Sequence, residues 1–439
     1  MTVQHKYQTK RLDCWPKLLE LRQQLTEELG TARERGELLV MGGETGLTSL
    51  PAGLGRFHFF AGLGPNTARI YGDYELLSRC LYQAEVMGYE SWDLCGPLRV
   101  HIGAMALGIL DQLPGGSREK PDFIFTERMC DQQAKGAQLM NDMYNASIPF
   151  FVIEAAPEPR VDYMVSQYAE FIAWMEKVTG RRYRDELLIE ATKNEWQTGV
   201  LWSRICELQK TVPAPLDLRT LFSLTTVIWR AGKHRSETIE FLQMVLDEVK
   251  DRVANKIAAL ATERYRLIYE GATPWFRTPT PILHYPHKYG AVCIGSCEAF
   301  TGGHGTWEIL EDGTMRAAPT LSELGMKVET RQQALEALAI LYLKYSPLKI
   351  GHRSVEERIK HRVRLAEDWH VDAVILNNSI GCRGNALGNA ETALALRAKG
   401  FPVIVDELDI IDPKEFDAER CERRMDDFLE VQGLRPLAS

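Results

Sequence analysis

Two separated parts of the chain alternate short apolar runs with longer segments of helical pattern, and this alternation constrains the fold most strongly. In the first part the runs are Phe123–Phe125 and IPFFVIEAAP; in the second they are AVCIGS, VDAVILNNS and PVIVDELD. Short apolar runs that alternate with helices are typical of parallel sheets covered by helices. We therefore expect an α/β fold of two flavodoxin- or Rossmann-like lobes.

Between these parts, residues 162–271 have an almost entirely helical pattern that ends in a stop signal at Gly271 and Pro274. The chain of 439 residues is long enough for two or three domains. The predicted organisation is an N-terminal helical segment, a first α/β lobe, a helical connecting segment and a second α/β lobe, over residues 1–50, 51–160, 161–275 and 276–439. Further helices are expected over residues 14–35, 76–87, 333–344, 354–368, 389–399 and 415–431, and a glycine-rich loop with a short strand over 42–64.

Two apolar runs lead through a polar loop to a cysteine: PDFIFTERMC ends at Cys130, and VDAVILNNSIGC ends at Cys382. Helical patterns follow both, and a third follows Cys95. Ligands of open α/β sheets bind beyond the carboxyl ends of the strands. A helix start also favours negative charge and lowers the pKa of a thiol. The three cysteines are therefore candidate metal ligands, although three buried structural cysteines are the alternative, and their wide spacing leaves both interpretations open.

The segments around these cysteines are SWDLCGPLRVHIG, PDFIFTERMCDQQAKG and VDAVILNNSIGCRGNALG. In this order and spacing they resemble the 2-hydroxyacyl-CoA dehydratase and benzoyl-CoA reductase family. The segment ERYRLIYEGATPW, expected to be helical, and PVIVDELDIIDPKEF are similar to the B-type subunit of benzoyl-CoA reductase. The resemblance implies a 4Fe–4S cluster in the cleft between the lobes, with Cys95, Cys130 and Cys382 as its ligands.

The function implied by the resemblance is a catalytic subunit of an ATP-dependent benzoyl-CoA reductase, an oxidoreductase of anaerobic aromatic degradation that dearomatises an aromatic acyl-CoA. The implied partners in a hetero-oligomer are a related cluster-binding subunit and ATPase activator subunits with their own cluster, which receive electrons from ferredoxin. The alternatives are a subunit of a radical 2-hydroxyacyl-CoA dehydratase and a non-catalytic electron-transfer subunit. Three thiolates leave one iron without a cysteine, and an open position favours chemistry at the cluster.

Three polar residues close to the cysteines are candidates for substrate binding or catalysis. Arg99 shares a helical face with Cys95 and is suited to offset cluster charge or to bind a CoA phosphate. His101 is suited to supply a proton, and Arg383 adjoins Cys382. The alternative for each is a polar residue that only supports the surrounding structure.

A second cluster of potential ligands has the pattern H-x2-H-x5-C-x3-C, formed by His284, His287, Cys293 and Cys297. This pattern is compatible with tetrahedral zinc. However, Cys293 lies inside an expected strand, which would separate the side chains, so packing is favoured and a role near the cluster or substrate is the second alternative. The remaining candidates, Cys14, Cys80, Cys206 and Cys421, lie in helical or terminal context and are not expected to be ligands.

Composition excludes several classes of protein. The net charge is −8 and no strongly basic stripe is present, so nucleic acid is not an expected partner. No apolar run reaches the ~18 residues of a membrane span, and the N-terminus has no apolar signal region, so a cytoplasmic location is expected. Nine widely spaced cysteines then indicate thiols or metal ligands rather than disulfides. Walker and Rossmann glycine motifs are absent from the sequence, so any ATP hydrolysis is expected in a partner.

Overall fold

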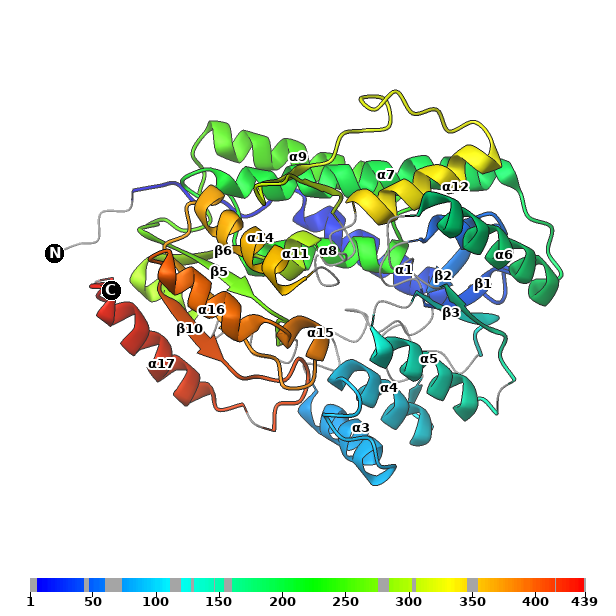
Figure 1. Ribbon diagram of the computed structural model, residues 1–439, viewed down its shortest axis with the longest axis horizontal. Coiled ribbons are helices and arrows are strands. Elements are labelled where there is room, and N and C mark those ends of the chain that lie inside the picture. Colours follow the sequence, from blue (N-terminus) through cyan, green and yellow to red (C-terminus); the bar gives the residue numbers. More distant parts are fainter. Residues whose placement is uncertain are drawn as a thin grey trace.

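The protein, described here from a computed structural model, has two four-stranded parallel sheets and a separate two-stranded hairpin. The sheets lie side by side, with helices around both, so the expected α/β fold of two lobes is confirmed (Figure 1). The structure describes residues 6–42, 47–59, 73–110, 120–127, 130–145, 147–153, 160–274, 284–301, 305–345, 354–414 and 416–437.

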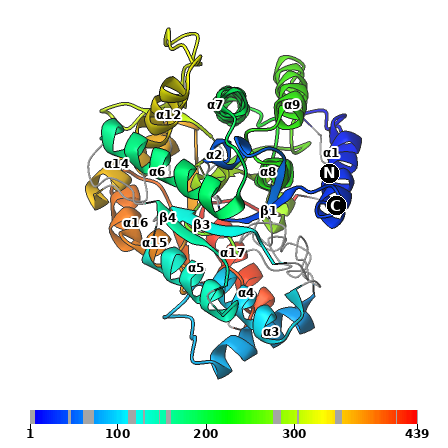
Figure 2. The ribbon, with the colours of Figure 1, turned by 90° about the vertical axis from the view of Figure 1, so that its right-hand side faces the viewer.

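The first sheet has the strand order β2-β1-β3-β4 and is covered on both faces (Figure 2). On β3, Phe123 and Phe125 pack on one face against Phe171 of α6, with ring centroids 6.3 and 4.9 Å away, while Ile124 joins the apolar cluster of α3, α4 and α5 on the other face. This is the two-residue alternation of a strand. The elements are β1 Leu38–Met41, β2 Phe57–Phe59, α3 Tyr74–Val86, α4 Gly96–Ala106, β3 Phe123–Glu127, α5 Asp131–Met143, β4 Phe150–Ile153 and α6 Val161–Thr179.

The second sheet has the order β10-β9-β5-β6, and all of its strands are parallel. Its strands are fully or largely buried, as expected for a parallel sheet with helices on both faces. The elements are α8 Leu218–Ala231, α9 Ser236–Ala254, β5 Tyr265–Glu270, β6 Ala291–Ser296, α11 Cys297–Thr301, α14 Val355–Asp368, β9 Ala373–Asn377, α15 Arg383–Ala386, α16 Asn389–Ala398, β10 Val403–Asp406 and α17 Ala418–Val431.

Helix α7, Asp185–Glu207, runs along both lobes and connects their cores (Figure 1). Trp196 and Val200 belong to the core of the first lobe, whereas Trp202 and Ile205 belong to the core of the second. One helix therefore contributes side chains to the cores of both lobes and links the two sheets. The remaining elements are α1 Trp15–Gly30, α2 Ser49–Ala52, η3 Leu208–Lys210, η4 Tyr285–Tyr289, the hairpin strands β7 Trp307–Ile309 and β8 Met315–Ala317, α12 Arg331–Ile340 and η5 Leu341–Tyr345.

Several expected elements are corrected by the structure. Residues 265–270, expected to be helical, form β5, which pairs with both β6 and β9 in the middle of the second sheet. The helix expected directly after Cys382 is interrupted at Gly388, whose positive φ of 77° separates α15 from α16. Strand β1 lies in the segment expected to be only helical. The expected helices at the N-terminus and in the second lobe are confirmed.

Within the described ranges, the helices lack the combination of length and apolar character that is needed to cross a bilayer.

Candidate functional site at the carboxyl ends of the sheets

The three candidate cysteines lie at helix starts, as expected from the sequence. Cys95 is the N-cap residue of α4, and Cys130 is the N-cap residue of α5, where its sulfur accepts a hydrogen bond from the backbone N–H of Gln133 at 3.4 Å. Cys382 immediately precedes α15. Cys130 follows the carboxyl end of β3 and Cys382 follows that of β9, where open α/β sheets bind ligands.

The loops that carry Cys95 and Cys382 meet across the side chain of Asp409, which follows the carboxyl end of β10. A Cβ atom on Gly381 would lie 2.4 Å from Asp409 Oδ2 and 3.7 Å from the backbone nitrogen of Gly96. A Cβ atom on Gly96 would lie 2.7 Å from Asp409 Oδ1. Only glycine fits at either position without displacement of the carboxylate. The cysteines next to these glycines also pack against one apolar cluster, so the fold brings the two lobes together at the thiols.

The thiols interact electrostatically, and backbone hydrogen bonds at the helix starts lower the pKa of Cys95 and Cys382 as expected, but a larger effect acts against them. Burial raises the pKa of Cys95, and the negative charges of Cys382, Cys130 and Asp409 raise it further. Burial, followed by the charges of Cys130 and Glu298, raises the pKa of Cys382 to about 11. Loss of solvation therefore outweighs the backbone hydrogen bonds that the helix starts donate to the thiols. A cationic centre between the thiols would reverse this balance, because a bound metal deprotonates its thiol ligands.

A single metal ion needs its thiolate ligands close together. Two thiolates on one zinc are at most about 4.6 Å apart, twice a Zn–S bond of about 2.3 Å. Among the described residues, the one set of three potential ligands whose atoms all lie within 4.8 Å of one another is Asp217, His284 and His287. Within the part of the chain that the structure describes, the three cysteines do not form such a set.

Side chains from α14 hold the Cys382 loop against the end of β5. Arg358 donates a hydrogen bond to the carbonyl oxygen of Gly384 at 3.1 Å, and Arg362 donates to Asn389 Oδ1 at 2.8 Å. The Nε of Arg362 also lies 3.3 Å from Glu270 Oε2. Burial raises the pKa of Glu270 to about 7, although the two guanidinium groups act in the opposite direction. No local sequence pattern indicated these contacts.

Arg99 lies in the interior of the protein. Its side chain is 1% exposed and bridges Glu85 Oε1 of α3 at 3.5 Å and Asp412 Oδ2 at 3.1 Å. Asp412 belongs to the turn after β10 that also contains Asp409, so the guanidinium ties α4 to the second lobe. This placement favours the supporting role that the sequence left as the alternative to phosphate binding.

His101 is also buried in α4, and neither of its ring nitrogens has a hydrogen-bond partner within the described structure. Burial lowers the pKa of His101 to about 4, so its imidazole is neutral near pH 7. Arg383 is the first residue of α15, and its side chain lies outside the described part of the molecule. A role of either residue in the reaction stays a prediction.

The structure arranges the second candidate ligand group, the H-x2-H-x5-C-x3-C segment, differently from the sequence pattern. Cys293 lies inside β6, fully buried, as expected for a strand residue. The two histidines converge instead with Asp217, the N-cap residue of α8. Cys297 begins α11, and its side chain is not described. Asp217 was missed because it lies far from the histidines in sequence.

The other cysteines, expected not to be ligands, lie in other parts of the structure. Burial is the main cause of a raised pKa for all of them, and it raises the pKa of Cys80 and Cys421 to about 11. Cys14 precedes α1, and the other three lie within helices: Cys80 in α3, Cys206 in α7 and Cys421 in α17.

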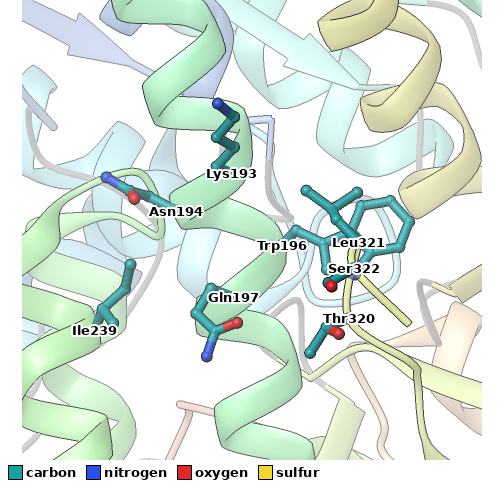
Figure 3. A pocket seen from close by; sticks show the side chains of 8 residues that line it. All are labelled: Lys193, Asn194, Trp196, Gln197, Ile239, Thr320, Leu321 and Ser322. Carbon is teal, nitrogen blue, oxygen red and sulfur yellow. The ribbon is translucent and has the colours of Figure 1, made fainter. Parts of the chain in front are cut away.

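A hollow with a volume of about 320 Å³ lies between α7, α9 and the loop after β8 (Figure 3). None of the candidate cysteines lines it. Its lining residues are Lys193, Asn194, Trp196, Gln197, Ile239, Thr320, Leu321 and Ser322.

The fold is that of a two-lobed α/β protein with three candidate metal-ligating cysteines at helix starts. Comparison with known proteins identifies the family within this class. Residues 79–431 match the family described as 2-hydroxyglutaryl-CoA dehydratase, D-component, and the chain belongs to this family.

Three relatives each share about four-fifths of their length with this chain. The (R)-phenyllactyl-CoA dehydratase alpha subunit of Clostridium sporogenes is 23% identical over 362 residues, 79% of each chain. The (R)-2-hydroxyisocaproyl-CoA dehydratase alpha subunit of Clostridioides difficile is 27% identical over 367 residues, 80% of each. The lactoyl-CoA dehydratase subunit alpha of Anaerotignum propionicum is 22% identical over 377 residues, 81% of this chain and 82% of the relative. These relatives support the dehydratase alternative and give no support to the benzoyl-CoA reductase that we expected first.

Proposed function

We propose that this chain is an alpha-type subunit of a radical 2-hydroxyacyl-CoA dehydratase, with Cys95, Cys130 and Cys382 as the ligands of one 4Fe–4S cluster. The observation that carries the proposal is the meeting of the Cys95 and Cys382 loops across Asp409, with Cys130 near enough to influence both thiols electrostatically. The dehydratase subunits among the relatives favour the reaction.

The proposed reaction removes water from a 2-hydroxyacyl-CoA and leaves a 2-enoyl-CoA. The hydroxyl group leaves from the carbon beside the thioester, and the proton leaves from the next carbon, so the oxidation state of the product equals that of the substrate. Without activation this proton is weakly acidic, which makes the direct elimination difficult. A 4Fe–4S cluster held by Cys95, Cys130 and Cys382 would supply the chemistry for this activation, the transfer of one electron that is returned at the end of each turnover.

The residues of this chain position the three cysteines and exclude water from them. The glycines beside Cys95 and Cys382 let the two loops approach Asp409, and Arg358 holds the Cys382 loop from outside. Both cysteines border an apolar cluster that includes Leu98 and Ile411, each at most 1% exposed. An apolar wall keeps water from a strongly reducing site and strengthens electrostatic interactions within it. Three thiolates leave one position for a substrate group.

The proposed partners are a related subunit that completes the substrate cavity and an activator that couples ATP hydrolysis to electron transfer. The absence of a Walker motif from this sequence supports a separate ATPase. We expect the purified chain alone to hydrolyse no ATP. Robust hydrolysis by the single chain, free of partners, would contradict the division into two components.

The decisive test of the reaction is the number of electrons consumed for each product. The complex and its activator would be assayed anaerobically with a limiting amount of reductant, first with 2-hydroxyacyl-CoA compounds and then with benzoyl-CoA. A dehydratase forms many product molecules per electron, because the electron is recovered. Ring reduction with two electrons consumed per product would instead establish the reductase, and electron transfer without turnover of either substrate would favour a non-catalytic subunit.

A further inference from the structure

Asp217, His284 and His287 lie near the amino ends of the strands of the second sheet, whereas the cysteines lie near the carboxyl ends. His284 and η4 precede the amino end of β6, whereas Cys382 follows the carboxyl end of the parallel strand β9. A strand of six residues spans about 20 Å. This group of side chains is therefore separate from the candidate cluster site, and nothing in the proposed dehydration uses it.

One potential ligand atom from each of the three residues lies within 4.8 Å of the other two. Two neutral imidazoles and one carboxylate match the ligands of His₂-carboxylate sites for zinc and related divalent metals. We propose that Asp217, His284 and His287 form a binding site for a divalent transition-metal ion such as Zn²⁺, which fastens η4 to the start of α8.

The state of each side chain fits a ligand. His287 Nε2 is buried and has no hydrogen-bond partner within the described residues. Imidazole binds a metal ion in its neutral form, through a ring nitrogen that is free of a proton. Asp217 Oδ1 accepts a hydrogen bond from the backbone N–H of Thr220 at 2.8 Å. That bond orients the carboxylate, as outer contacts commonly do for metal ligands.

Arg219 is the competitor of the metal ion at this site. Its Nη1 lies 2.7 Å from His284 Nε2, and its charge disfavours a second cation nearby. The side chain is exposed and can move into solvent when the ion binds through His284. Removal of this guanidinium should therefore strengthen metal binding, whereas loss of a true ligand should weaken it.

The opposite side of η4 is already fixed to α17. Tyr285 and Tyr289 donate hydrogen bonds to Asp426 at 2.7 and 2.8 Å, and Lys288 lies 2.8 Å from the same carboxylate. A metal ion bound to His284 and His287 would therefore link α8, η4 and α17 to one another just before the start of β6. Three protein ligands leave a position for water.

The test is zinc binding by the full-length chain, measured by competition with a chelator and by metal content, with iron measured in parallel. We expect one zinc per wild-type chain. Asp217→Asn and His287→Asn should each weaken binding at least tenfold, and Arg219→Gln should strengthen it severalfold. His370→Asn is the matched control, because His370 is exposed and asparagine tolerates its positive φ of 53°.

The circular dichroism spectrum and the iron content check that each variant remains folded. A Zn²⁺-dependent rise in the melting temperature of wild-type protein, absent from the folded His287→Asn variant, would support the site. Wild-type zinc affinity in both ligand variants, or weaker binding in Arg219→Gln, would overturn the proposal. Because the readout is zinc rather than turnover, failure here is distinguishable from failure of the proposed dehydratase function.

Discussion

The two strand–loop–cysteine units have similar sequences but different anchoring. The thiol of Cys130 is exposed and is held by its own helix, through the N–H of Gln133 in a helix of 13 residues. The thiol of Cys382 is half-buried before a helix of only four residues, and Arg358 holds its loop from a distant part of the chain. Helix capping is a local interaction, whereas the second arrangement depends on the complete fold. Changes remote in sequence should therefore disturb Cys382 more than Cys130.

The largest effect is expected from replacement of the thiols themselves. Cys95→Ser, Cys130→Ser and Cys382→Ser should each lose most of the iron and at least a hundredfold in activity, because thiolate is the ligand form. Cys14→Ser and Cys421→Ser are the controls and should retain both. The measurement is iron per chain after anaerobic purification. Full iron content in one of the first three variants would remove that cysteine from the ligand set.

The next effect concerns the ion pairs that join α4 to the second lobe. Arg99→Met leaves Glu85 and Asp412 without their shared cation, and because both carboxylates remain partly exposed, the expected loss is about 1.5–3 kcal/mol. Denaturant unfolding should detect this loss, with the exposed Arg79→Met as the control. If Arg99 binds substrate instead, the variant would raise KM and leave the free energy of unfolding unchanged.

A smaller effect on the free energy of unfolding is expected from Glu270, which lies beside Arg362 of α14, the helix that holds the Cys382 loop. The pKa of Glu270 is raised from 4.5 to about 7, so the folded state binds this proton more tightly than the unfolded state. The resulting stabilisation of the folded state is fully present below pH 4.5 and is lost as the pH rises through 7. Between pH 5 and pH 7, wild-type protein should lose about 2 kcal/mol relative to Glu270→Gln.

Denaturant unfolding at several pH values measures this difference for Glu270→Gln, and the exposed Glu240→Gln is the control. A constant difference between wild type and Glu270→Gln across this range would show that Glu270 stays ionised in its pair with Arg362.

The smallest effect separates two glycines near Cys382, namely Gly381 in the loop before it and Gly384 in α15. Gly381→Ala would place a Cβ atom 2.4 Å from Asp409 Oδ2, whereas Gly384→Ala meets no atom within 4 Å. Overpacking of this kind costs about 1–3 kcal/mol. We expect Gly381→Ala to lower iron retention severalfold and Gly384→Ala to leave it unchanged. Equal iron content in both would show that the approach of Asp409 does not position Cys382.

The sequence predicted those features that depend on local pattern. Parallel strands show as short buried runs, and the positions of Cys95, Cys130 and Cys382 at helix starts follow from the elements that flank them. Strand β5 was missed because its six residues lie in a long helical context, and only pairing with β6 and β9 distinguishes a short apolar strand from a helix turn.

Features that depend on long-range packing had no such signal. Asp217 joins the histidines, and Asp409 joins the glycines, only after distant segments have packed together. The net rise in the pKa of Cys95 and Cys382 was also missed, since burial depends on the whole fold and outweighs the backbone hydrogen bonds at the helix starts.

We propose above all that the thiolates of Cys95, Cys130 and Cys382 hold one cluster with a position open to substrate. Electron paramagnetic resonance of the reduced complex, with and without a 2-hydroxyacyl-CoA, tests it most directly, because the signal of a cluster depends on its ligands and exposure. We predict an iron–sulfur signal that changes when the acyl-CoA binds and is absent from Cys382→Ser. An identical signal with and without substrate, or an unchanged signal in Cys382→Ser, would contradict the account.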